Sequence, residues 1–174
     1  MTDTIFALSS GAPPAGIAVI RVSGPAAREA LAALSGRLPT PRRATFLPLR
    51  DARGDLLDHA LVLWLPGPAT ATGEDTAELH CHGGRAIVAA LENALAEVPG
   101  LRPATAGEFT RRAFANGRID LAEAEGLADL LLAETELQRR NAMAMAGGSF
   151  SRQVGGWREP VSYTHLTLPT KRIV

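Results

Sequence analysis

The sequence predicts a mixed α/β (α+β) domain followed by the start of an all-α helical domain. Up to about residue 103, short β-branched apolar runs between Gly- and Pro-rich turns alternate with stretches of helical spacing. Beyond that point only helical spacing continues. The hydrophobic content of 46% is that of an ordered globular protein. We place the first domain at 1–118, the incomplete helical domain at 119–160, and a non-native tail at 161–174.

The chain begins with two predicted strands and a helix. Residues 5–8 and 17–22 are β-branched-rich runs, and the loop 9–16 between them is rich in Gly, Pro and Ser. A helix then opens at residues 23–25, with Pro near its first turn, and runs through Leu34.

A hairpin, a further strand and a second helix follow. Residues 44–49 and 59–65 alternate as strands do, and the turn 53–55 can join them as a hairpin. Residues 75–82 predict another strand, and residues 85–98 predict a helix.

Helical spacing dominates the rest of the chain, over 107–116, 120–134 and 134–157, with weak points at two glycine pairs. Asp120 is a suitable N-cap, and Glu123 three residues later forms a capping-box-like pair with it. One apolar stripe of the second helix comprises Leu121, Ala124, Leu127, Ala128 and Leu131. The stripe has too little partner surface in this chain, which predicts an incomplete helical domain and poor solubility.

The predicted strand 75–82 has the most functional residue pattern. Its alternation puts Glu78, His80 and His82 on one face and Ala77, Leu79 and Cys81 on the other. Three possible ligands in a row raise the hypothesis of a zinc site. Ligands normally converge from separate elements, however, and the only other histidines are His59 and His165. We therefore expect no metal, satisfied or solvated histidines, and a Cys81 that is a small core residue.

Two charged residues interrupt otherwise apolar strands. A carboxylate at Glu78 on an inner strand is costly unless a cation or a pair of donors meets it. It could accept the adjacent N–H and NH2 groups of a pterin, or it could pair with an arginine. Arg21 could likewise reach the surface or meet an anion; from the residues alone, the surface is favoured.

No phosphate-binding loop for a nucleotide is present. Gly83-Gly84 precedes a predicted helix and could expose backbone N–H groups to an anion, but such pairs also mark ordinary turns. The Gly-Lys-Ser/Thr sequence of a Walker A loop does not follow it or occur elsewhere in the chain. We therefore predict no catalytic residue and no GTPase activity for this chain.

Charge and cysteine content favour a cytoplasmic protein. The formal net charge is zero, so no overall basic field attracts nucleic acid or a membrane. The single cysteine cannot form an internal disulfide, and the N-terminus lacks the pattern of a signal peptide. No apolar run approaches the roughly 20 residues that span a bilayer.

The C-terminal residues differ in composition from the rest. Of the 18 lysines and arginines, the only lysine is Lys171, and the only tyrosine is Tyr163. An ordinary polar C-terminus is one reading. The segment 161–174 also resembles translated adapter sequence, so we expect it to be foreign and the natural protein to be truncated near residue 160.

Several ordered blocks resemble the N-terminal region of the MnmE (TrmE) family of tRNA-modification GTPases. The most specific block is 107–121, GEFTRRAFANGRIDL, followed by Ala124-Glu125. The other blocks are Asp3-Thr4-Ile5, GIAVIRVSG at 16–24, TGED at 72–75 and HGG at 82–84. The resemblance covers about residues 3 to 159.

The resemblance implies a fold and a function. The family's N-terminal domain is of the folate-binding type found in aminomethyltransferase-like proteins; it forms a homodimer and binds 5-formyl-tetrahydrofolate or a related one-carbon folate. The whole protein carries a Ras-like GTPase domain that uses GTP, Mg and K. With the FAD-dependent partner MnmG it modifies C5 of the wobble uridine (U34) of tRNA. The alternatives are a stand-alone folate-dependent aminomethyltransferase-like protein and a non-enzymatic dimerisation scaffold.

Carried over by position, the family's folate contacts fall on Arg21, Glu78 and Arg118. The resemblance makes ligand contact the better interpretation for Arg21 and Glu78. Many relatives have lysine at the position of Arg118, and arginine keeps the charge but changes reach and donor geometry.

Overall fold

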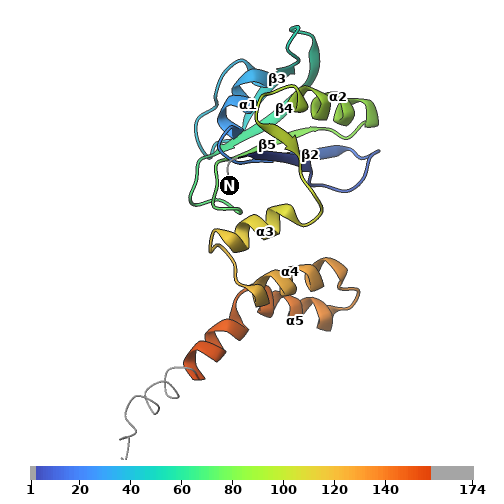
Figure 1. Cartoon of the computed structure of the whole chain (residues 1–174). Helices are drawn as coiled ribbons and strands as arrows, with labels where there is room; N and C mark the ends of the chain where they lie inside the picture. Colours follow the sequence, from blue (N-terminus) through green and yellow to red (C-terminus); the bar gives the residue numbers. More distant parts are fainter. Residues whose placement is uncertain (1–2, 158–174) are drawn as a thin grey trace, which may run out of the picture. The chain divides into compact units, whose positions relative to one another are not determined.

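A computed structural model describes residues 3–157 of the chain (Figure 1). The predicted foreign segment, 161–174, lies outside the described residues. The chain divides into two compact units, Met1–Arg118 and Ile119–Val174. The first unit is the mixed α/β domain and the second is helical, as the sequence predicts.

The first unit is built on one six-stranded sheet. Its strands are β1 (Thr4–Leu8), β2 (Ile17–Ser23), β3 (Thr45–Arg50), β4 (Leu56–Leu65), β5 (Thr76–His82) and β6 (Leu101–Pro103). Their order across the sheet is β3-β4-β5-β2-β1-β6. Neighbouring strands are antiparallel except β1 and β6, which are parallel. Strands β2 and β5 therefore lie at the centre of the sheet.

Two helices, α1 (Ala27–Ser35) and α2 (Arg85–Ala96), pack on one face of this sheet (Figure 1). Alternate residues of the strands point into this layer. The buried core joins strand residues such as Ile20, Val62 and Leu79 with helix residues such as Leu31 and Leu91. This packing leaves the opposite face of the sheet free of α1 and α2.

The third helix, α3 (Glu108–Ala115), lies on that opposite side (Figure 1). Its Phe109 ring approaches Arg21 of β2, and its Arg112 is hydrogen-bonded to Glu74, just before β5. Glu108, Arg112 and Ala113 are buried, so the helix presents one side to the sheet. The open face is thus covered at one end by α3.

The helical unit contains α4 (Leu121–Leu132) and α5 (Glu136–Ala146), which pack against each other, and a further helical stretch over 149–157. Each labelled helix starts with a capping box. Asp120 and Glu123 form the first box, as predicted, and Thr135 and Gln138 form the second. These reciprocal hydrogen bonds satisfy backbone N–H groups that the first turn leaves free.

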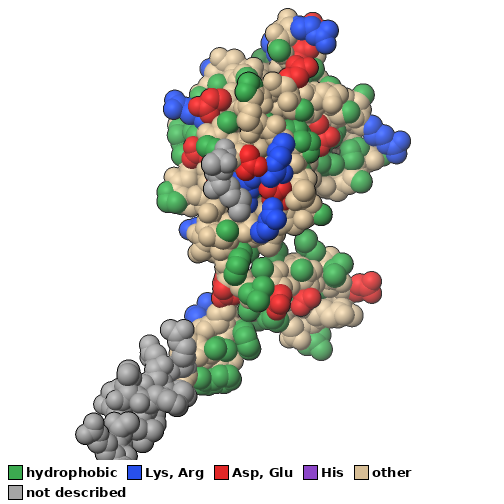
Figure 2. All heavy atoms as spheres, viewed as in Figure 1, with side chains coloured by type: hydrophobic (Ala, Val, Ile, Leu, Met, Phe, Trp, Pro, Cys, Tyr) green, Lys and Arg blue, Asp and Glu red, His purple; other side chains and the backbone are tan. Residues whose placement is uncertain are grey.

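The apolar stripe predicted on α4 is largely exposed. Leu121, Leu127 and Leu131 are exposed, and the buried residue of α4 is Gly126. Figure 2 shows hydrophobic side chains over the surface of this helical part of the chain. Among the described residues, no helix is long and apolar enough to cross a membrane.

Some elements differ from the sequence predictions. Strand β6 was not predicted, because three residues ending in Pro103 carry too little periodicity to indicate a strand. The predicted strand 59–65 begins earlier, at Leu56, and the predicted helix after residues 23–25 begins later, at Ala27. Residue Gly24 has φ +134° and precedes the helix instead of starting it.

Candidate functional site

The candidate site lies on the face of the sheet opposite α1 and α2. The alternation predicted for β5 is confirmed: Ala77, Leu79 and Cys81 are in the core, whereas Glu78, His80 and His82 are more exposed. Because β5 is an inner strand, its polar face continues onto β2 on one side and β4 on the other.

Arg21 and Glu78 form an ion pair on this face. They are direct cross-strand partners in the register of β2 and β5. Arg21 donates to Glu78 Oε1 from Nε at 3.0 Å and from Nη2 at 2.8 Å. His80 Nε2 lies 3.2 Å from the other oxygen, Oε2. The structure therefore brings together two of the three predicted ligand residues, Arg21 and Glu78. It also contains the ion pair with an arginine that was the alternative interpretation of Glu78.

The Glu78 side chain is only 16% exposed. Burial alone raises the pKa of its carboxyl, but the hydrogen bonds from Arg21 and His80 outweigh burial and hold that pKa below its ordinary value. Glu78 is thus a carboxylate at neutral pH. An ionised carboxylate on an inner strand can accept a pair of N–H donors.

Arg118, the third predicted residue, lies just after α3. Its side chain packs on the turn at Gly73, where an added Cβ would lie 3.2 Å from Arg118 Cγ. Asn116 Nδ2 donates to the carbonyl of Thr72 in the same turn at 2.7 Å. Within the described residues no hydrogen bond or ion pair joins Arg118 to Arg21 or Glu78. Arg118 is exposed.

An aromatic ring borders the pair. The Cζ of Arg21 lies 5.8 Å from the centre of the Phe109 ring, which α3 supplies. Position 109 belongs to the 107–121 block that carries the resemblance. Its apolar ring borders one side of Arg21, whose side chain remains 30% exposed.

A hollow lies farther along the sheet, next to His80, and neither Arg21 nor Glu78 lines it. Its volume is about 280 Å³, and its lining residues include Ile17, Phe46, Leu61, His80 and His82. His82 Nδ1 lies 2.8 Å from Asp58 Oδ1, so this imidazole is held by a buried carboxylate. The hollow combines apolar walls with imidazole edges, which suits a flat heterocyclic ligand.

The Gly83-Gly84 pair has a structural explanation. A Cβ at Gly83 would lie 2.4 Å from the carbonyl oxygen of Ala15, and the Gly83 carbonyl accepts a hydrogen bond from Ala15 N at 3.0 Å. Glycine is required there because the loop 9–16 passes close to the strand-to-helix turn. This contact accounts for Gly83 without an anion.

Sequence reasoning missed an ion cluster around the buried side chains of Arg112 and Glu108. We call it the Arg112 cluster; it comprises Asp3, Glu74, Arg102, Glu108 and Arg112. In the sequence these residues are scattered polar positions, and only the run Arg111-Arg112 inside an otherwise amphipathic helix hinted that one arginine faces inward. Figure 2 shows acidic and basic side chains side by side on this part of the first unit.

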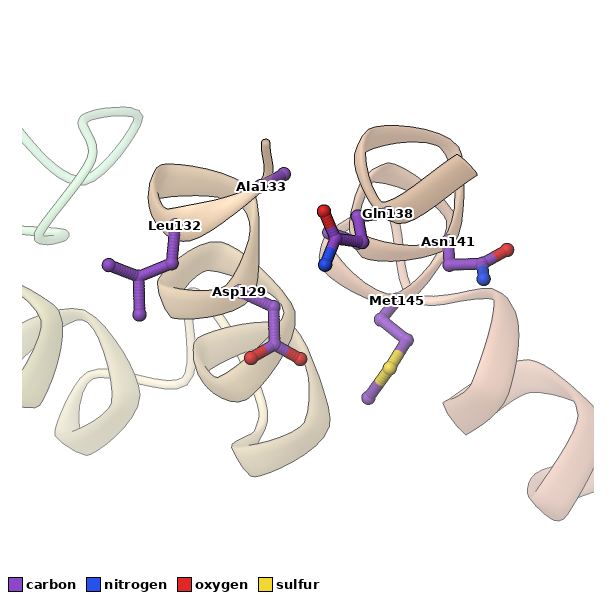
Figure 3. A pocket seen from close by; sticks show the side chains of 7 residues that line it. Asp129, Leu132, Ala133, Gln138, Asn141 and Met145 are labelled. Atoms are coloured by element: carbon purple, nitrogen blue, oxygen red, sulfur yellow. The ribbon is translucent and has the colours of Figure 1, made fainter. Parts of the chain in front are cut away.

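The described residues contain no group of three or more His, Cys, Asp or Glu side chains placed to hold a metal ion. A pocket of about 250 Å³ lies between α4 and α5 (Figure 3). Its lining includes Asp129, Leu132 and Met145, and none of the predicted site residues is there.

The fold and site define a mixed α/β domain with a carboxylate–guanidinium pair on a sheet face that only α3 covers, at one end. The family model "GTP-binding protein TrmE N-terminus" matches residues 4–118, which is the first unit. The chain belongs to this family.

The chain is similar to longer proteins called tRNA modification GTPase MnmE. The one from Novosphingobium aromaticivorans is 74% identical over 159 residues, which is 91% of this chain and 36% of the relative. Those from Erythrobacter litoralis and Azorhizobium caulinodans are 69% and 62% identical over the same length, again 91% of this chain and 38% and 37% of the relative. The chain therefore spans little more than a third of these relatives.

Proposed function

We propose that the first unit binds 5-formyl-tetrahydrofolate, or a related one-carbon folate, on the open face of its sheet. The observation that carries the proposal is the ionised Glu78 carboxylate on an inner strand, whose neighbour His80 lines a hollow with apolar walls. Glu78 would accept the adjacent N–H and NH2 groups of the pterin edge, and such charge-assisted bidentate bonds are short and specific.

The donors around Glu78 fit the rest of such a ligand. Arg21 holds the carboxylate ionised and, from the same face, offers positive charge to the carbonyl groups of the ligand. Arg118 is exposed and would meet the glutamyl carboxylates. The bound folate supplies the one-carbon unit; the residues of this chain bind and orient it.

Ligand titration tests the proposal. Calorimetry of the chain with 5-formyl-tetrahydrofolate should show binding that Glu78→Gln weakens at least tenfold, about 1.4 kcal/mol, since the variant lacks the charge and one acceptor. Glu29→Gln is the matched control, because Glu29 is exposed on α1, on the other side of the sheet. Equal affinity of wild type and Glu78→Gln would overturn the placement, and no binding by wild type would overturn the function.

We also propose that the whole protein is a GTPase that acts in tRNA modification. The family match and the names of the relatives support this. With GTP, Mg and K bound by a domain absent from this chain, and with MnmG as the FAD-dependent partner, it would modify C5 of U34 in the cytoplasm. The chain alone, which lacks a Walker A sequence, should release no phosphate from GTP; release above a buffer blank would contradict this.

We further propose that the first unit forms a homodimer. Exposed apolar side chains outside the hollow, Leu56 (49% exposed) and Phe114 (51%), support it, because such groups seek a partner surface. Light scattering after size-exclusion chromatography should give twice the mass of one chain. A monomer at micromolar concentration, with and without folate, would exclude the dimer.

A further inference from the structure

Arg112 of the Arg112 cluster is the most buried charged group of the described chain. Its side chain is 0% exposed, and its Nη1 and Nη2 atoms donate to three different partners. The partners are Asp3 at 2.9 Å, Glu74 at 3.1 Å and Glu108 at 3.2 Å. Arg102 completes the cluster by bonding Asp3 at 2.7 Å and Glu108 at 2.6 Å. The cluster therefore joins the N-terminus, β6, α3 and the segment before β5.

Attaching a helix through such a cluster costs desolvation free energy. Removing each ion from water costs several kcal/mol, and apolar side chains of similar volume often hold two elements together as well or better. Arg112 Nε is moreover buried without a hydrogen-bond partner. What ions provide and apolar contacts do not is direction, because a guanidinium fixes each acceptor along an N–H bond.

The hydrogen bond from Arg112 to Glu74 connects the cluster to the candidate site. Ser23 Oγ donates to Glu74 Oε2 at 2.8 Å and lies 2.7 Å from Thr72 Oγ1. The carbonyl of Thr72 accepts from Asn116 Nδ2 at 2.7 Å. The turn between Thr72 and Glu74 is thus held by Arg112 on one side and by Asn116 on the other, and Arg118 packs on its Gly73.

The periodicity of α3 and β2 places Phe109 next to Arg21 and Arg112 near Ser23. Phe109 and Arg112 are three residues apart on α3 and lie on one side of it. Arg21 and Ser23 are two residues apart on β2 and lie on one face of the sheet. Phe109 consequently approaches Arg21 while Arg112 reaches the group bonded to Ser23. A shift of α3 would move Phe109 and Arg118 together.

We propose that Arg112 is a positioning residue for the folate site. Through Glu74 and the turn at residues 72–74 it sets where Phe109 and Arg118 stand relative to the Arg21–Glu78 pair. This inference rests on the proposed function, because it names the residue that orients parts of that same site. Arg112 itself touches no ligand in this account.

Arg112→Lys tests the inference, with Arg111→Lys as the matched control. Lysine keeps the charge but cannot direct donors at three carboxylates, whereas Arg111 is exposed and makes one 3.5 Å contact, to Glu108. Affinity for 5-formyl-tetrahydrofolate is measured at a temperature where circular dichroism shows every variant folded. Arg112→Lys should weaken binding about tenfold, a loss of about 1.4 kcal/mol, and Arg111→Lys should leave it within twofold.

Asn116→Ala serves if Arg112→Lys does not fold. Asn116 is exposed, so its loss spares the core, yet it removes the bond that holds the turn from the α3 side. It should also weaken binding. Folded Arg112→Lys or Asn116→Ala that binds as tightly as wild type would show a merely structural role and overturn the inference.

Amide hydrogen exchange distinguishes a wrong positioning role for Arg112 from a wrong proposed function. If wild type binds no folate, the proposed function is wrong. Positioning still requires faster amide exchange at residues 72–74 and 116–118 in Arg112→Lys than in Arg111→Lys. Unchanged exchange at both segments would overturn positioning by itself.

Discussion

Glu78 shows how a residue can satisfy two interpretations of the sequence at once. An arginine pair and a ligand contact were alternatives for its carboxylate, and the structure provides the pair with Arg21. The pair also keeps Glu78 ionised, which is the state that a pterin edge requires. For this residue the ion pair and the proposed ligand contact are therefore compatible.

Glu108 gives the clearest pH prediction. The hydrogen bond from Arg102 above all, with further bonds from Thr105 and Arg112, holds the pKa of Glu108 far below its ordinary value of 4.5. Because the folded-state pKa is depressed, the ionised carboxylate stabilises the fold above about pH 4.5 and loses this contribution as pH falls further. Glu108→Gln should therefore lower Tm strongly at pH 7 and by a smaller amount at pH 3, where part of this contribution has been lost.

Thermal unfolding followed by circular dichroism checks this. Glu29→Gln, at an exposed site on α1, is the control and should show the same small Tm difference at both pH values. A Tm deficit of Glu108→Gln that stays constant from pH 7 to pH 3 would refute the role of the ionised carboxylate.

At the scale of elements, helix α4 begins with a capping box whose contribution can be measured. Asp120 Oδ1 accepts from Glu123 N, and Glu123 Oε2 accepts from Asp120 N, each at 2.8 Å. Asp120→Ala removes the first acceptor and should cost about 1 kcal/mol. Denaturant unfolding of the helical unit measures this cost, with the exposed mid-helix substitution Glu125→Ala as control. Equal stability of the two variants would mean that the box contributes nothing.

The elements also show what sequence patterns can and cannot predict. The strand 76–82 and its two faces were predictable, because alternation is local and strong. The Arg112 cluster was not, since Asp3, Glu74 and Arg112 meet only after the sheet and α3 have come together. The same holds for the Arg21–Glu78 pair, which depends on the register of β2 and β5. Periodicity predicts faces, whereas cross-strand and helix-to-loop partners depend on topology.

At the scale of the whole molecule, the two units have separate roles in this account. The first unit, which the family model matches, holds every residue of the proposed folate site. The helical unit exposes Leu127 and Leu131, and the chain spans little more than a third of its relatives. GTP hydrolysis and tRNA modification are accordingly proposed for the whole protein, and folate binding for this chain.

The most direct test of the account is a crystal structure of the chain with 5-formyl-tetrahydrofolate bound. We predict that the pterin lies on the open face of the sheet, with its N–H and NH2 groups within hydrogen-bonding distance of the Glu78 carboxylate. Arg21 and Arg118 should lie toward the remainder of the ligand. A folate bound elsewhere, or a Glu78 carboxylate that contacts only Arg21 and His80 in a folate-bound chain, would contradict it.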